Sequence, residues 1–138
     1  MKEQLNKILL IDDSEADNFV HKRVIKKCNV TKSIVAKLSG ESALEYLTTL
    51  EEDQYPNPDL IFLDINMPGM NGWEFLEEYD KLDEEFKAGI VVTMLTTSSS
   101  PDDRARAQEN GIIDHFENKP LTSEVLMKVL EKHFPERF

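Results

Sequence analysis

The sequence has little cysteine, little positive charge and no long apolar run, and each shortage excludes a class of protein. Cys28 is the only cysteine among 138 residues, so no disulfide and no cysteine-based metal site can form within the chain. The 16 basic residues are outnumbered by 27 acidic ones, and a formal net charge of −11 argues against a nucleic-acid surface. No apolar run approaches the ~20 residues that a membrane-spanning helix needs. We therefore expect a protein of a reducing cytoplasm, with no nucleic-acid partner and no membrane insertion.

The composition fits one globular domain. Apolar residues make up 40% of the chain and are spread along its length, and no stretch has the composition of a linker. We therefore expect a single domain over residues 1–138. The basic residues that do cluster fall on one expected helix, where a solvated face is the simpler interpretation. They are Lys22, Arg23, Lys26 and Lys27.

Short β-rich runs alternate with amphipathic helical ones along the chain. Strands are expected at residues 7–11, 33–38, 60–63, 90–95 and within 112–117. Helices are expected at residues 15–28, 41–50, 72–86, from Ser100 up to Gly111, and at 123–133. This alternation predicts a parallel sheet with helices on both faces and right-handed connections. In the first helix a four-residue spacing predicts the inner face. That face comprises Ala16, Val20, Val24 and Cys28, with Phe19 beside them.

Four of the expected strands are followed directly by polar or charged residues. In chain order these are Asp12–Asp13, Asp64, Thr96–Thr97 and Lys119–Pro120. The carboxyl ends of parallel strands share one edge of the sheet, so three carboxylates, a hydroxyl and an ammonium can meet there. Carboxylate oxygens are ligands that Mg²⁺ prefers, and an ammonium can neutralise phosphoryl oxygens. The sequence therefore predicts a site for Mg²⁺ and a phosphoryl group.

The order and types of these residues resemble the receiver domain of two-component response regulators. The run Asp-Ile-Asn-Met-Pro-Gly-Met-Asn-Gly at residues 64–72 belongs to the same resemblance, which covers nearly the whole chain. It implies an α/β fold of flavodoxin-like type, a doubly wound five-stranded parallel sheet of order 2-1-3-4-5 with five helices. It also implies a stand-alone receiver of the chemotaxis-regulator-like type, with no DNA-binding or enzymatic output domain.

The resemblance assigns a role to each residue at the strand ends. Asp64 would be the phosphoacceptor, because a carboxylate can attack a phosphoryl group to form an aspartyl phosphate. Both partners are negative, so a cation must neutralise their approach. The Mg²⁺ ligands would be Asp13, Asp64 and the main-chain carbonyl of Asn66, with Asp12 acting through a bound water. Lys119 would bring positive charge to the phosphoryl oxygens, aimed inward by a cis peptide bond to the following proline.

Two threonines are candidates to supply the hydroxyl that would bond the phosphoryl group. Counting back from Gly111 at the spacing usual in receivers reaches Thr96, whereas counting back from Lys119 reaches Thr97. The two counts differ by one residue, which implies an insertion relative to other receivers. We prefer Thr96, because an inserted residue is easier to accommodate in the turn before the fifth strand than inside a capped helix. Phe116 takes the position of the aromatic ring that turns inward in receivers when this hydroxyl moves.

The expected function is signalling. A sensor histidine kinase would donate a phosphoryl group to Asp64, and a phosphorylation-dependent protein contact would carry the signal onward. The alternative is a phosphorelay intermediate that passes the group to a histidine phosphotransfer protein. A Mg²⁺ phosphohydrolase of the haloacid dehalogenase-like class is a remote alternative, because its general acid would have to be Asn66. We expect no enzymatic activity beyond the protein's own phosphorylation and autodephosphorylation.

Overall fold

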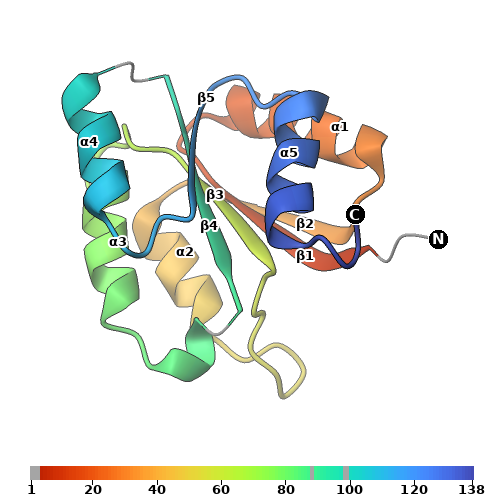
Figure 1. Ribbon diagram of the computed structural model, residues 1–138. Helices are drawn as coiled ribbons and strands as arrows, with labels where there is room; N and C mark the ends of the chain where they lie inside the picture. The colour runs from red at the N-terminus through yellow and green to blue at the C-terminus, as the bar shows by residue number, and fades with distance from the viewer. Residues whose placement is uncertain (1–3, 88, 98–99) are drawn as a thin grey trace.

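The computed structural model describes residues 4–87, 89–97 and 100–138, and in these residues five strands form one parallel sheet (Figure 1). The strand order is β2-β1-β3-β4-β5, as predicted. The strands are β1 (Leu5–Ile11), β2 (Thr31–Lys37), β3 (Leu60–Leu63), β4 (Val91–Thr96) and β5 (His115–Asn118). The helices are α1 (Glu15–Cys28), α2 (Gly40–Leu47), α3 (Gly72–Asp80), α4 (Pro101–Glu109) and α5 (Ser123–His133), with a short 3-10 helix η1 (Glu84–Phe86). No helix among the described residues is both long and apolar enough to cross a membrane.

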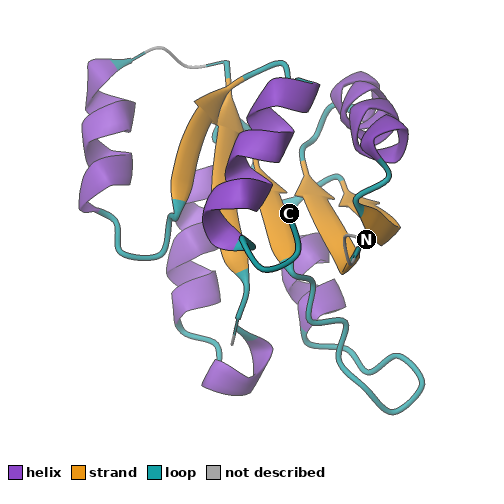
Figure 2. Ribbon diagram, turned by 45° about the vertical axis from the view of Figure 1, so that its right-hand side comes forward, coloured by secondary structure: helices purple, strands orange, loops and turns teal. Residues whose placement is uncertain are grey.

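Apolar cores lie on both faces of the sheet, and Figure 2 shows helices on either side. On β1, Leu9 and Ile11 belong to the core beneath α2, α3 and α4, whereas Ile8 and Leu10 belong to the core beneath α1 and α5. This alternation follows from the two-residue period of a strand. All four residues of β3 are buried, as expected for a central strand covered on both faces.

Side-chain caps start every helix that follows a strand. Each capping side chain accepts a hydrogen bond from a backbone N–H of the first turn, which satisfies one of the free donors there. The caps are Ser14, Ser39, Asn71, Ser100 and Thr122. The helices therefore begin at fixed residues shortly after the strands end, which keeps the helix starts near one edge of the sheet.

The predicted inner face of α1 is wrong in its first two turns. Ala16 is exposed, and Phe19 and Val20 are 62% and 46% exposed. The buried residues of α1 are Asn18, His21 and Ile25. The start of α1 covers the polar strand ends and not the apolar core, so its inner side is polar there. Val24 and Cys28, farther along, do pack against the core.

Two helices end earlier than predicted. α2 ends at Leu47 and not at residue 50, and Thr48 leaves the helical conformation with φ −106° and ψ 8°. The hydroxyls of Thr48 and Thr49 bond carbonyls of the preceding turn at 2.9 and 2.6 Å. Leu50 consequently lies outside the helix and is 56% exposed. α3 ends at Asp80 and not at residue 86, and the chain then forms η1. These shorter helices leave the strand ends that carry the candidate site unchanged.

Candidate functional site

The register of β1 and β3 brings three carboxylates together. Ile11 pairs with Leu63, so the aspartates that follow these residues leave neighbouring strands at the same level. The Asp64 N–H donates to the Ile11 carbonyl at 3.0 Å and continues the ladder by one bond. Oxygens of Asp12, Asp13 and Asp64 all lie within 4.8 Å of one another. Asp12 and Asp64 are buried and Asp13 is exposed, so the cluster opens to solvent on one side.

Lys119 is the residue directly after β5, and its side chain reaches this cluster of carboxylates. Its ammonium lies 2.6 Å from Asp12 Oδ2, 2.8 Å from Asp17 Oδ2 and 3.6 Å from Asp64 Oδ1. The peptide bond to Pro120 is cis, as predicted. Burial alone would lower the pKa of Lys119, but the bonds to Asp12 and Asp17 and the charge of Asp64 hold it above its usual value. The lysine is therefore a half-buried group that stays charged at neutral pH.

Asp64 is the carboxylate whose ionisation the fold disfavours. Burial raises its pKa, the charge of Lys119 lowers it, the charge of Asp12 raises it, and a backbone hydrogen bond from Asn66 lowers it. The result is a pKa of about 6. A further positive charge nearby would stabilise the ionised form of such a carboxyl group and lower its pKa.

The donor set fits a divalent cation. Oxygens bound directly to Mg²⁺ lie 2.0–2.1 Å from it, so two of them are at most about 4.2 Å apart. A set of oxygens within 4.8 Å therefore accommodates the ion with a small side-chain movement or with one carboxylate bound through water. Among the described residues, Asp12, Asp13 and Asp64 are the only group of three or more acidic, histidine or cysteine side chains close enough to hold a metal.

A glycine lets the loop after β3 fold back against Asp64. The Gly72 N–H donates to the Ile65 carbonyl at 2.8 Å. A Cβ at Gly72 would lie 2.5 Å from the Asp64 carbonyl oxygen and 2.8 Å from the Ile65 Cα. No side chain fits at this close approach, which holds the start of α3 against the backbone of the candidate phosphoacceptor.

The two candidate threonines differ in burial. Thr96 is the last residue of β4 and its side chain is buried, whereas Thr97 is exposed. The Thr96 carbonyl accepts the Lys119 N–H at 2.8 Å. Phe116 is half-buried against the core, with the Arg104 guanidinium 5.1 Å from its ring centroid. The assignment of Thr96 and Phe116 as the responding pair stays a prediction.

Sequence reasoning missed three residues of α1 that contact or line the site. Asp17 bonds Lys119, and the Asn18 Nδ2 donates to the Asp12 carbonyl at 3.0 Å. Asn18 and His21 are buried and line a cavity of about 10 Å³ together with Asp12 and Asp64. Burial and the charge of Lys119 lower the pKa of His21. The signal in the sequence was a polar stripe on an amphipathic helix that directly follows Asp12.

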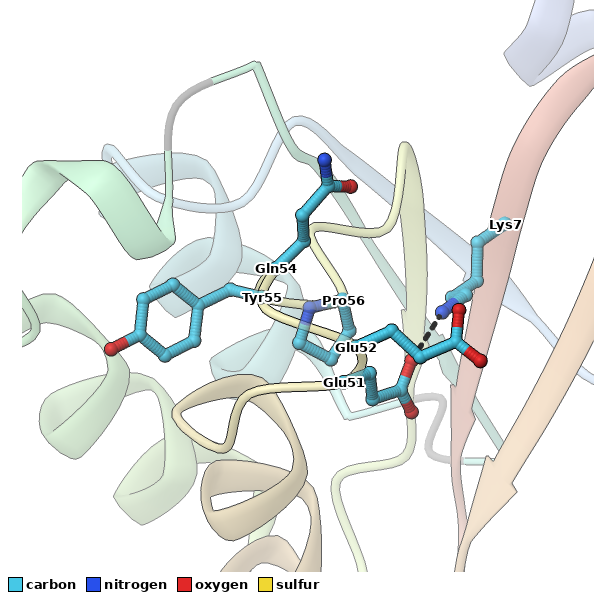
Figure 3. A pocket seen from close by; sticks show the side chains of 6 residues that line it. All are labelled: Lys7, Glu51, Glu52, Gln54, Tyr55 and Pro56. Carbon is cyan, nitrogen blue, oxygen red and sulfur yellow. Dashed lines mark hydrogen bonds and ion pairs between the residues drawn. The ribbon is translucent and has the colours of Figure 1, made fainter.

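A second polar region lies at the opposite end of the sheet (Figure 3). It is lined by Lys7, Glu51, Glu52, Gln54, Tyr55 and Pro56. The Lys7 ammonium lies 3.2 Å from Glu51 Oε2, a carboxylate on the loop that follows α2. This loop lies below the sheet in Figure 1, away from the strand ends that carry Asp12 and Asp64.

Comparison with known proteins shows the family of this chain. Residues 8–131 match the model of the response regulator receiver domain. The chain is 34% identical to the probable methanogenesis regulatory protein FilR2 of Methanothrix harundinacea over 91% of this chain and 79% of FilR2. It is 36% identical to the response regulator Rcp1 of Synechocystis sp. over 70% of this chain and 65% of Rcp1, and so spans less than two thirds of that relative.

A solved structure shows the same architecture. The crystal structure of a two-component response regulator from Cytophaga hutchinsonii is 30% identical to this chain and superposes with a TM-score of 0.86. The similarity covers 96% of this chain and 99% of that one. Together with the family match over residues 8–131, this shows that the chain belongs to the receiver domain family of two-component response regulators.

Proposed function

We propose that Asp64 accepts a phosphoryl group from a sensor histidine kinase in a reaction that requires Mg²⁺. The observation that carries the proposal is the convergence of Asp12, Asp13 and Asp64 with the ammonium of Lys119 at one edge of the sheet. A carboxylate nucleophile, a cation site and a fixed positive charge are the groups that phosphoryl transfer to an aspartate needs.

Each group has a distinct part in the transfer. A carboxylate oxygen of Asp64 attacks phosphorus, the bond from phosphorus to the donor's nitrogen breaks, and an acyl phosphate forms. Lys119, now 3.6 Å from Asp64 Oδ1, neutralises the phosphoryl oxygens. Asp13, Asp64 and the Asn66 carbonyl would hold Mg²⁺, with Asp12 contributing through a water. The bound ion would offset the charge of the acidic cluster.

The output is proposed as a change at the β4–β5 edge. The Thr96 hydroxyl would bond a phosphoryl oxygen, and Phe116 would follow it inward. This change would create or remove a contact with another protein of the cytoplasm. Onward transfer to a histidine phosphotransfer protein is the alternative output, and action without an output domain stays a prediction.

The test is phosphorylation by a small donor. We expect acetyl phosphate with Mg²⁺ to add one phosphate to the parent protein, as measured by intact mass, and none in Asp64→Asn. Chelation of Mg²⁺ should abolish the addition. Asp53→Asn, which removes an exposed carboxylate from a distant loop, is the matched control and should be labelled like the parent. Equal labelling of Asp64→Asn would disprove the assignment.

A further inference from the structure

The ammonium of Lys119 lies closer to a carboxylate of α1 than to the proposed phosphoacceptor. Its distance to Asp17 Oδ2 is 2.8 Å, compared with 3.6 Å to Asp64 Oδ1. Asp17 is not one of the strand-end residues, and the proposed chemistry assigns it no role. This contact joins residues 102 positions apart, so the fold and not the local sequence creates it.

The backbone of Asp17 is held in register with Asp12. The Ser14 N–H donates to Asp12 Oδ1 at 3.0 Å, and the Ser14 hydroxyl accepts the Asp17 N–H at 3.1 Å. In the next residue, the Asn18 amide donates to the Asp12 carbonyl at 3.0 Å. Two of these hydrogen bonds fix the start of α1 to Asp12, and the third caps the helix at Asp17, so that the Asp17 carboxylate lies beside Lys119.

We infer that Asp17 is a positioning residue that holds the Lys119 ammonium on the α1 side of the site and competes for it with a phosphoryl group on Asp64. The inference rests on the proposed phosphorylation of Asp64. It concerns how fast the site reacts and not which residue reacts.

The burial of the three carboxylates indicates which contact is released when a phosphoryl group arrives. The side chains of Asp12 and Asp64 are each 6% exposed, whereas that of Asp17 is 42% exposed. Water can solvate the Asp17 carboxylate after Lys119 leaves, but it cannot solvate Asp12 to the same degree. Lys119 would therefore keep its bond to Asp12 and exchange the bond to Asp17 for one to the phosphoryl oxygens.

A purely structural explanation of Asp17 must be separated from this role. Acidic side chains in the first turn of a helix interact favourably with its dipole, and α1 carries both Glu15 and Asp17 there. Glu15 is exposed and lies two residues from Asp17. Glu15→Gln therefore removes the same charge from the same turn and leaves the contact between Asp17 and Lys119 in place.

The experiment compares phosphorylation of Asp17→Asn and Glu15→Gln by acetyl phosphate at saturating Mg²⁺. Both variants lose one negative charge, so both should bind the anionic donor slightly better. At saturating donor, Asp17→Asn alone should react about two- to fivefold faster, the factor expected from a partly exposed ion pair. Asp17→Glu, which keeps a carboxylate, should return the rate toward the parent value. Equal or slower reaction of Asp17→Asn would overturn the inference.

A double variant tests whether Asp17 acts through the lysine. In a Lys119→Gln background, Asp17→Asn should change the saturated rate no more than Glu15→Gln does. An acceleration that persists without Lys119 would also overturn the inference.

Side-chain NMR decides the contact independently of turnover. The Lys119 Cε signal, identified by its loss in Lys119→Gln, should shift in unphosphorylated Asp17→Asn and stay in place in Glu15→Gln. An unshifted signal would show that Asp17 does not hold the lysine, even if labelling is normal. If the parent accepts no phosphate but the signal shifts, the proposed function fails and the contact stands.

Discussion

Lys119 and Lys7 lie at opposite ends of the parallel sheet, and each meets carboxylates there. Lys119 is 9% exposed and contacts Asp12, Asp17 and Asp64. The Lys7 side chain is 18% exposed, and its ammonium forms an ion pair with Glu51, whose side chain is 51% exposed. The two ends are about 16 Å apart along β1, as the rise of a strand implies for residues 7 and 12.

The difference between the two ends comes from how the carboxylates are delivered. At the Lys119 end, neighbouring strands and a capped helix each contribute an acid, and the ladder hydrogen bonds fix their positions. At the Lys7 end, the acid comes from a loop in which Glu52 and Asp53 take positive φ angles of 48° and 72°. Strand register therefore brings two buried carboxylates and a lysine into one cluster, whereas the loop supplies one solvated pair.

The largest expected effect is the loss of Lys119. Without Mg²⁺, Lys119→Gln leaves the buried carboxylates of Asp12 and Asp64 facing each other without a counter-ion. We expect the free energy of unfolding to fall by about 3 to 4 kcal/mol, as for one broken partner of a buried ion pair. Lys7→Gln breaks an exposed pair and should cost less than about 1 kcal/mol. Urea unfolding in a metal chelator at neutral pH measures both, and similar losses would contradict the comparison.

The next effect concerns Asp64 and pH. The fold raises the pKa of Asp64 from 3.8 to about 6, so between these values the folded protein binds more protons than the unfolded chain. The contribution of Asp64 to stability should therefore fall as pH rises through these values, by up to about 3 kcal/mol in the absence of Mg²⁺. Asp64→Asn removes this loss, so it should be more stable than the parent above pH 7 and similar to it below pH 4.

Denaturant unfolding at pH 4, 6 and 8 in a metal chelator measures this difference. Asp53→Asn, an exposed carboxylate on the loop at the other end, should show no such trend. A constant difference between Asp64→Asn and the parent at all three pH values would show that burial of Asp64 does not oppose its ionisation.

The smallest effect concerns the backbone beside Asp64. Gly72→Ala would place a Cβ 2.5 Å from the Asp64 carbonyl oxygen, so the backbone must shift. We expect a loss of about 2 kcal/mol in unfolding free energy. At Gly40, also the first residue of a helix, the added Cβ would meet the flexible side chain of Met70 at 2.7 Å. Gly40→Ala should therefore cost less than about 1 kcal/mol, and equal losses would contradict this explanation.

The fold and the strand-end residues could be predicted because they depend on local patterns and one geometric rule. Apolar runs that end in Asp12 and Asp64 predict strands, and parallel strands bring their ends to the same edge. The cis peptide bond before Pro120 followed from the resemblance and is confirmed. The bounds of α1 and α5 agree with the prediction because strong caps begin both helices.

The inner face of α1 could not be predicted from apolar periodicity. That pattern assumes that the buried side of a helix is apolar, which favoured Phe19 and Val20. At the site the buried side is polar and is formed by Asn18 and His21. Asp17 was missed for a different reason. An acid in the first turn is ordinary for a helix, and its partner Lys119 is visible only after the chain has folded.

The hydrogen bond between the Lys119 N–H and the Thr96 carbonyl joins the end of β5 to the end of β4. β5 is a short strand at the outer margin, with β4 as its single neighbour in the sheet, and this bond lies at their common end. A phosphoryl group on Asp64 that reaches the side chains of both Lys119 and Thr96 would tie central β3 to the outermost strand across β4. Phosphorylation would then stiffen the β5 margin of the sheet, where a partner could sense the change without touching the aspartate.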